Sequence, residues 1–296
     1  MPKSTFPERK PTFRKVFLIT AEVMAARSRP LLIAVLSFTL LSAVVAAFTD
    51  VRVQKVEDRL AADAGVSWVE LTKVVNGRLA NMTETGALRI AAGVRMQKLG
   101  QVPSINSGSL AMLDREEAMV IAYIVGIAPW SSLSFALIGA IFFVAGTFFL
   151  TLAVAGRQSA YEVSKRLPKS IFSMIGLCFW VLVRSFIWIP FIGLLIAVYM
   201  LPRLSLSPVL FIGGANGIMK SAGASMLRTR GKWFTVFVSF LGAAAVGILI
   251  LWVGLSVVSV LAIFSSKAAW LLWMFSLFFA VAFEAFFWTM FTVTLE

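Results

Sequence analysis

The sequence predicts an all-α membrane protein: a polytopic bundle of about six transmembrane helices, with a helical extramembrane insertion after the first span. Of the 296 residues, 59% are hydrophobic and 14% are charged, whereas a soluble domain is typically about 45–50% apolar and about 25% charged. The mean hydropathy is +0.90. The 26 Phe and the aromatic content of 13% exclude a disordered chain.

Composition also limits the chemistry that we expect. Histidine is absent and cysteine occurs once, as Cys178. The commonest general base and metal ligand is therefore missing, and one thiol forms neither a zinc site nor an internal disulfide. The net charge is +13, and its basic residues lie beside apolar runs, where they set topology and contact anionic lipid headgroups. We expect lipid partners, no nucleic acid, no metal and no cofactor.

The first 29 residues are predicted to be a basic amphipathic segment on the cytoplasmic side, with seven Lys and Arg against two Glu. Apolar side chains recur there at helical spacing, namely Phe17, Leu18, Ala21, Met24 and Ala25. The first span follows over residues 30–49, close to the roughly 20 residues that cross a hydrocarbon core. Asp50 and Arg52 end its apolar stretch.

Residues 50–117 form the one large polar segment, with nine basic and nine acidic residues. Ser67 and Glu70 have capping-box spacing, and the helix that follows carries an apolar stripe made of Trp68, Leu71, Val75, Leu79 and Met82. A second helix is expected over 87–99, stopped by Gly100, and then a loop over 101–109. The stripe fits two interpretations: the contact of a small cap with the membrane domain, or a docking surface for a partner.

Residues 118–296 are predicted to form a bundle of about five further spans. Residues 118–155 are apolar over 38 positions, which as one helix would measure roughly 57 Å. We expect a break at Pro129–Ser132 followed by a span over 132–154; the alternative is a tight hairpin with two short crossings. The remaining spans are expected at 171–189, 191–213, 233–263 and 268–294.

The basic loops at 156–170 and 214–232 are expected on the inside. Both termini are then cytoplasmic and residues 50–117 lie outside. This orientation fits a bacterial inner membrane, and an organelle membrane stays open. Close helix packing is expected along the fifth span, at Gly242, Ala243, Ala244, Ala245 and Gly247.

Three charged residues lie inside apolar runs: Arg184, Arg203 and Glu284. Each costs at least about 2.5–3.5 kcal/mol near the bilayer centre, so such residues usually face the bundle interior and pair. We expect a buried Arg203–Glu284 pair. It would be either a structural ion pair or, with Arg184, a polar site for a lipid headgroup or a transported anion.

The segment Leu201–Pro208 is followed by Ser225-Met226-Leu227-Arg228-Thr229-Arg230-Gly231-Lys232-Trp233. This pattern resembles the YciC-like group of six-span bacterial membrane proteins, which includes the membrane domain attached to some glycerophosphodiester phosphodiesterases. The resemblance covers roughly residues 155–296 and implies a six-helix membrane fold with a link to lipids or envelope maintenance, without catalytic residues.

In that pattern, Pro208 loosens a helix at the inner interface and Gly231 lets the chain turn into the next span. We expect a membrane-facing surface at Ile218, Met219, Ala222 and Met226. Headgroup contacts are expected from basic side chains, namely Lys165, Arg166, Arg228, Arg230 and Lys232.

Together these observations favour a non-enzymatic accessory or scaffolding subunit that uses the 50–117 segment to hold a protein partner or a second copy. The alternative is a transporter or lipid-handling protein built on Arg184, Arg203 and Glu284. A third hypothesis, a membrane enzyme acting on lipid, lacks a cluster of polar residues at one interface.

Overall fold

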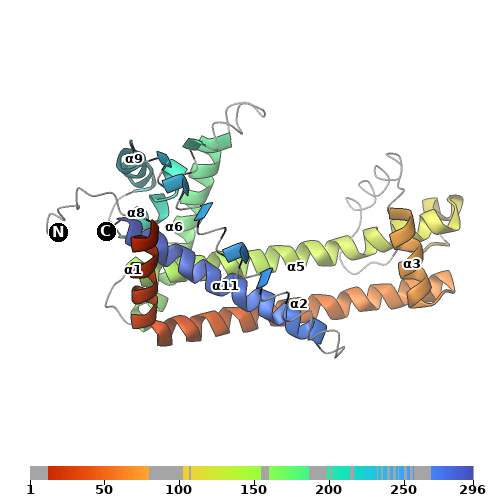
Figure 1. The fold of residues 1–296 in the computed structure, drawn as a ribbon. Helices are drawn as coiled ribbons and strands as arrows, with labels where there is room; N and C mark the ends of the chain where they lie inside the picture. The colour runs from red at the N-terminus through yellow and green to blue at the C-terminus, as the bar shows by residue number, and fades with distance from the viewer. Residues whose placement is uncertain are drawn as a thin grey trace. The chain divides into compact units, whose positions relative to one another are not determined.

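The computed structural model describes residues 13–79, 103–106, 108–154, 160–186, 199–200, 202–213, 217–231 and 268–295, with scattered positions between 233 and 256. Within these residues every regular element is a helix (Figure 1), which confirms the all-α class. Three helices are long and apolar enough to cross a membrane: α2 (Ser28–Ala64), α5 (Arg115–Val154), and Leu272–Val293 within α11 (Ala268–Leu295). The length and composition of these three helices indicate an integral membrane protein. The full set of six crossings stays a prediction.

The chain divides into two compact units. One is Leu41–Ala140, and the other combines Met1–Leu40 with Ile141–Glu296. Both boundaries fall inside helices, so α2 and α5 each contribute to both units. These boundaries differ from the predicted insertion over 50–117, because the polar parts of α2 and α5 are continuous with their apolar parts.

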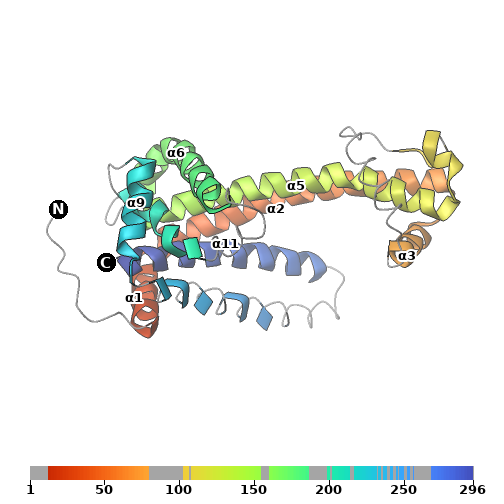
Figure 2. The ribbon, with the colours of Figure 1, turned by 90° about the horizontal axis from the view of Figure 1, so that it is seen from above.

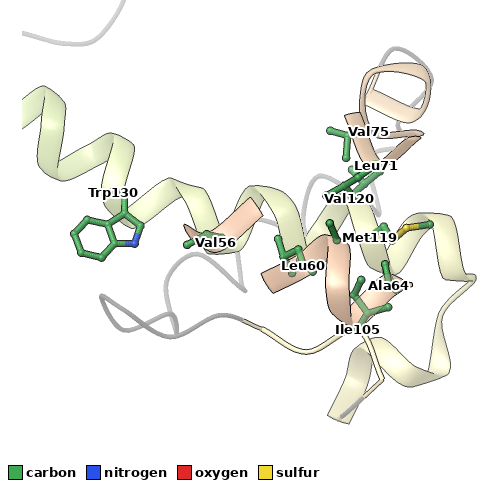
Figure 3. Close-up of a cluster of buried hydrophobic side chains, with 12 residues drawn as sticks. Val56, Leu60, Ala64, Leu71, Val75, Ile105, Met119, Val120 and Trp130 are labelled. Atoms are coloured by element: carbon green, nitrogen blue, oxygen red, sulfur yellow. The ribbon is translucent and has the colours of Figure 1, made fainter. Parts of the chain in front are cut away.

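The unit Leu41–Ala140 has its own apolar core, which joins α2, α3 (Trp68–Leu79) and α5. Figure 3 shows Leu71 and Val75 of α3 pointing toward Val120 and Met119 of α5. The core is completed mainly by Val56, Leu60, Ala64, Ile105 and Trp130. A turn at Gly65, whose φ is 64°, separates α2 from α3. The Ser67 hydroxyl accepts the Glu70 amide at 3.3 Å, as capping-box spacing predicts.

Polar contacts fasten the segment between α3 and α5 to the end of α2. The Asp63 carboxylate accepts the Ser104 hydroxyl at 3.0 Å and the Ile105 backbone N–H at 2.7 Å. The Asn106 amide donates to the Asp63 carbonyl at 3.1 Å, and the Arg115 guanidinium donates to the Ala64 carbonyl. The short 3-10 helix η1 (Gly108–Met112) then leads into α5. Of the predicted loop 101–109, residues 103–106 are non-helical as expected, whereas residues 108 and 109 already belong to η1. The predicted helix 87–99 lies outside the described residues.

The predicted break at Pro129 is wrong, and so is the two-crossing hairpin. α5 is one helix of 40 residues with Pro129 inside it. The apolar run is long because it contributes both to a protein core and to a candidate membrane span. Its first part is buried in the unit's core, including Ala118, Met119, Val120 and Ala122, and the helix as a whole is long and apolar enough to be a candidate span. Proline removes one backbone hydrogen bond, and the helix nevertheless continues through Pro129.

α2 likewise continues past Asp50 and Arg52, which end the apolar stretch but not the helix. Its membrane part is apolar on the outside, where the exposed side chains are Leu32, Ile33, Leu36, Leu40, Leu41, Val44 and Phe48. Its buried face mixes the apolar side chains Leu31 and Val35 with small and hydroxyl side chains, namely Ala34, Thr39, Ser42, Ala43 and Thr49. A water-soluble helix shows the opposite distribution, so this face of α2 is suited to lipid.

The second unit is built on α1 (Phe13–Ala26), α5, α6 (Ala160–Phe186) and α11. α1 packs against α11, and α8 (Ser207–Gly213) packs against α9 (Ile218–Arg228) (Figures 1 and 2). α1 confirms the predicted N-terminal helix. Val16 and Thr20 are buried, whereas Leu18, Ala21 and Ala25 of the predicted stripe are exposed, and the contact of this stripe with a membrane surface stays a prediction.

The predicted span over 191–213 is wrong in its C-terminal part. A turn at Ser205–Leu206 interrupts the helix, and the Ser205 hydroxyl donates to the Pro202 carbonyl at 2.7 Å. Pro208 lies in the first turn of α8, where a missing N–H is tolerated. α6 begins at Ala160, so much of the predicted loop 156–170 is helical. Residues 187–198 and 257–267 lie outside the described part of the chain.

Candidate functional site

The predicted Arg203–Glu284 pair does not form. Arg203 follows Tyr199 and precedes the turn at Ser205, instead of lying midway along a span. Its guanidinium donates to Tyr199 and Met226. Glu284 packs elsewhere, against Gly146 and Trp288. The side chain of Arg184 lies outside the description. Among the described residues the ion pairs are those that Arg78 makes with Asp114 and Glu116, and Arg203 and Glu284 do not share one site.

Arg203 joins the 199–208 segment to the end of α9. Its Nη1 lies 3.0 Å from the Tyr199 hydroxyl, and its Nη2 lies 3.0 Å from the Met226 carbonyl oxygen. Met226 belongs to the last turn of α9, where carbonyls lack partners within the helix, and a cation there is stabilised by the helix dipole. The Arg203 carbonyl in turn accepts the Ser225 hydroxyl at 2.6 Å. Arg203 is therefore a structural clamp.

The turn after α9 contains Gly231, as the segment 225–233 predicts. Thr229 is buried, and its hydroxyl donates to the Ser225 carbonyl at 2.9 Å. Gly231 has φ 74°, a conformation that favours glycine, as the sequence predicted. The Trp233 indole then donates to the Tyr199 carbonyl at 3.0 Å, and its ring stacks on Phe237 with centroids 5.3 Å apart.

Glu284 occupies a notch between α5 and α11. The Trp288 indole donates a hydrogen bond to its carboxylate. A Cβ added at Gly146 would collide with Glu284 Oε1 and would lie 2.9 Å from Trp288 Nε1, so only glycine leaves room for this carboxylate. The residue as a whole is half-buried, but Oε2 is removed from solvent and accepts no hydrogen bond within the described part of the chain.

Trp288 and Gly146 were missing from the sequence-predicted site. Trp288 lies four residues after Glu284, on the same face of the helix, so its spacing was a usable signal. Gly146 gave no such signal, because its role depends on which face of α5 meets α11. By contrast, the predicted close packing of the fifth span is confirmed at Gly247, where an added Cβ would lie 2.8 Å from Phe283 Cζ and closer still to other atoms of that ring.

The basic residues predicted to contact headgroups are exposed where they are described. Lys165, Arg228 and Arg230 are exposed; the Arg166 side chain and Lys232 lie outside the description. The predicted membrane face of α9 needs correction. Ala222 is buried and Ile218 packs in the core of the unit, whereas Met219 is 68% exposed and Leu227 is 71% exposed. The small residues face inward because they let α9 approach α8.

The predicted docking stripe is also largely covered. Leu71 and Val75 are buried in the core that α3 shares with α2 and α5, so they offer no surface to a partner. The side chains of Trp68 and Leu79 and the whole of Met82 lie outside the description. The described part of the stripe therefore packs inside its own unit, against α2 and α5, and this contact confirms neither of the two interpretations.

Comparison with known proteins gives no family for this chain. No protein-family model, no curated protein and no solved structure matches it. Among the described residues, no group of three or more Cys, Asp or Glu side chains is placed to hold a metal ion.

Proposed function

We propose that the protein is a non-enzymatic accessory or scaffolding subunit of a membrane complex, which presents the polar residues 50–117 of the unit Leu41–Ala140 outside the bilayer. The observation that carries this proposal is the continuity of α2 and α5. Each helix runs unbroken from its candidate span into the core of that unit. Helices of 37 and 40 residues measure about 56 and 60 Å at about 1.5 Å per residue, twice a hydrocarbon core of about 30 Å.

The partner contact is proposed to use the outer surface of this unit, because the predicted stripe is covered. Val69 is 74% exposed and Met112 is 88% exposed, although both are large apolar side chains. Exposed apolar side chains on a domain with a complete core are typical of interaction sites when they cluster. A second copy of the chain is the alternative occupant.

The test is purification from native membranes in a mild detergent, with quantitative mass spectrometry of the proteins that co-purify. We expect one stoichiometric partner with the native chain and its loss from the Val69→Glu, Met112→Glu double variant. The matched control is Lys73→Glu on the exposed part of α3. The scaffold proposal fails if no protein co-purifies stoichiometrically, or if the double variant keeps every partner.

Anionic lipid is the second proposed partner. The outer side of α9 combines exposed Met219 and Leu227 with Lys220, Arg228 and Arg230, and it carries no acidic residue. Such a face fits an anionic membrane surface. Replacing the three basic residues by Gln is expected to lower the anionic lipid that co-purifies with the protein, while Lys55→Gln in the other unit leaves it unchanged.

We also propose membership of the YciC-like group and a bacterial inner-membrane location, with six crossings, both termini inside and residues 50–117 outside. The contacts of Arg203, Thr229 and Gly231 support the group assignment, because they give each element of the motif a structural role. A cysteine at Asp58 is expected to react with a membrane-impermeant maleimide in intact cells. Labelling only after lysis would reverse the orientation.

A transporter or lipid-handling protein is the second candidate function. The predicted site of Arg184, Arg203 and Glu284 does not support this function, because the Arg203 guanidinium donates to Tyr199 and to Met226 of α9. The observation that still favours it is the Glu284 carboxylate in the span, since ionisable residues there usually mark a pathway or a binding site. Unchanged uptake and lipid composition in a Glu284→Ala strain would exclude it.

A further inference from the structure

The carboxyl group of Glu284 is placed unusually for a residue of a candidate span. Glu284 lies within the apolar stretch Leu272–Val293. One carboxylate oxygen, Oε1, lies against Gly146, and the indole of Trp288 donates to the group. The other oxygen, Oε2, is removed from solvent and accepts no hydrogen bond from the described residues. Among the described residues, the carboxylate of Glu284 therefore accepts a hydrogen bond from one neutral donor, the indole of Trp288, although it has two oxygens.

The helices around this carboxyl supply no charged partner in the described contacts. Glu284 is the sole charged residue of Ala268–Leu295, and neither residues 132–154 of α5 nor residues 30–49 of α2 carry a charge. α1 contributes Arg14, Lys15 and Glu22, which are all exposed, and the Arg27 guanidinium that follows α1 donates to the Leu152 carbonyl at 2.8 Å. The segment with Gly247, which meets Phe283, is uncharged from Trp233 to Ser256. On α6, Lys165 is exposed, and the side chains of Glu162, Arg166, Lys169 and Arg184 lie outside the described part of the chain.

An ionised carboxylate in such surroundings is unfavourable, because burial disfavours the charged form and one indole donor does not replace its hydration. A bound proton removes the charge and turns the carboxyl into a donor. Ionisable groups inside membrane spans are commonly functional for the same reason, since they exchange ions with the aqueous phase.

We propose that Glu284 is a proton-binding site, in which the carboxyl takes up a proton and is held as a neutral acid between Gly146 of α5 and Trp288 of α11. Gly146 provides the space, Trp288 orients the carboxyl by donating to it, and the uncharged helix faces favour the protonated form. The bound ligand is the proton itself. This inference is independent of the scaffold proposal and gives the protein an ion-binding activity within the bilayer.

The probe is dicyclohexylcarbodiimide, an apolar reagent that reacts with protonated carboxyl groups. The acid proton goes to a carbodiimide nitrogen while a carboxyl oxygen bonds to the carbodiimide carbon, and the adduct rearranges to a stable N-acylurea. The native full-length chain is treated in its membrane, and each modified carboxyl is located by peptide mass spectrometry. We expect modification at Glu284 that is strongest at mildly acidic pH and declines at least tenfold as the pH is raised.

The controls separate this site from ordinary carboxyl groups. Glu70 on the exposed part of α3 should remain essentially unmodified. Gly146→Ala, which crowds Oε1, should lower the rate at Glu284, whereas Gly139→Ala on the same helix, with nothing within 4 Å of the added Cβ, should leave it unchanged. Glu284→Gln should remove the modification and the infrared carbonyl band of a protonated acid.

Two results would overturn the proposal, and both are measured on the native chain, so neither depends on a variant that folds. One is the absence of modification at Glu284 at mildly acidic pH while the protein remains folded. The other is modification that does not vary with pH and is blocked by sodium or potassium, which would make the ligand a metal cation instead of a proton.

Discussion

The carboxylate of Asp63 accepts the backbone N–H of Ile105 at 2.7 Å, which ties the last turn of α2 to a residue 42 positions further along the chain. The neighbouring Ser104 hydroxyl binds the same carboxylate oxygen, and Ile105 itself is buried in the core of the unit. One acidic side chain therefore aligns the apolar contact of Ile105 with the end of α2.

Asp63→Ala is expected to loosen this segment. It leaves the Ile105 N–H without its acceptor, and loss of a hydrogen bond to a charged group costs about 1.5–3 kcal/mol. Hydrogen exchange at Ile105 should accelerate by an order of magnitude or more. Asp58→Ala on the exposed side of α2 is the control and should leave that rate unchanged. Equal exchange in both variants would mean that the carboxylate does not hold the segment.

Arg203→Ala is expected to destabilise the second unit. It removes donors to Tyr199 and to Met226 at the end of α9, a loss of about 2–3 kcal/mol for a part-buried charged donor. The apparent Tm in detergent should fall by several degrees. Arg230→Ala, on the exposed turn after α9, should change it little. If both variants melt at the native temperature, the Arg203 clamp is not needed for folding.

Gly247→Ala is expected to be more disruptive than its size suggests, because the added methyl group would meet the Phe283 ring. Overpacking of this kind typically costs about 1–3 kcal/mol. Gly139→Ala serves as the control, since its methyl group meets nothing and alanine favours the helix. The apparent Tm should fall for the first variant and hold or rise for the second; the reverse order would rule out the Gly247–Phe283 contact.

Pro129→Ala is expected to stabilise α5. Alanine restores a backbone N–H inside the helix, where an internal proline costs about 3 kcal/mol. Thermal unfolding monitored by tryptophan fluorescence should shift upward, and Trp130 reports on the same turn. A lower unfolding temperature would mean that the helix depends on the geometry that Pro129 imposes.

The lipid-facing side of α2 is tested by spin labels on a chain whose single cysteine, Cys178, has been replaced. Nitroxides at Leu36 and Leu40 should collide mainly with dissolved oxygen, which concentrates in lipid. Nitroxides at Asp58 and Arg59 should collide mainly with a water-soluble nickel chelate. Access of the chelate to Leu36 would contradict the placement of this stretch in the bilayer.

The sequence was sufficient for features that depend on local chemistry. The Ser67 cap, the positive φ of Gly231 and the all-α class all follow from residue type and spacing. It was insufficient for α5, because an apolar run has the same composition whether its partner is lipid or a protein core. Residues 118–122 are apolar because they pack in a protein core. Counting them as part of a membrane span made the apolar run too long for one crossing, and this led to the wrong prediction of a break at Pro129.

The prediction of an Arg203–Glu284 pair was wrong for a different reason. Hydropathy identified Arg203 and Glu284 as costly residues, but it carries no information on which helix faces meet. The turn at Ser205 and the clamp at Met226 engage Arg203. The notch at Gly146 depends on a contact between residues 138 positions apart, and no local pattern encodes it.

The unbroken course of α2 from Pro30 to Asp63 couples its polar end to the thickness of the bilayer. A helix whose apolar stretch exceeds the hydrocarbon thickness responds by tilting. Because α2 has no hinge between its apolar and polar parts, a tilt imposed by thinner lipid must change the inclination of residues 50–64 by the same angle. Over the roughly 22 Å of those fifteen residues, tilting by about 20° displaces Asp63 sideways by about 7 Å, so a change of tilt in the apolar part of the helix becomes a movement of its polar end.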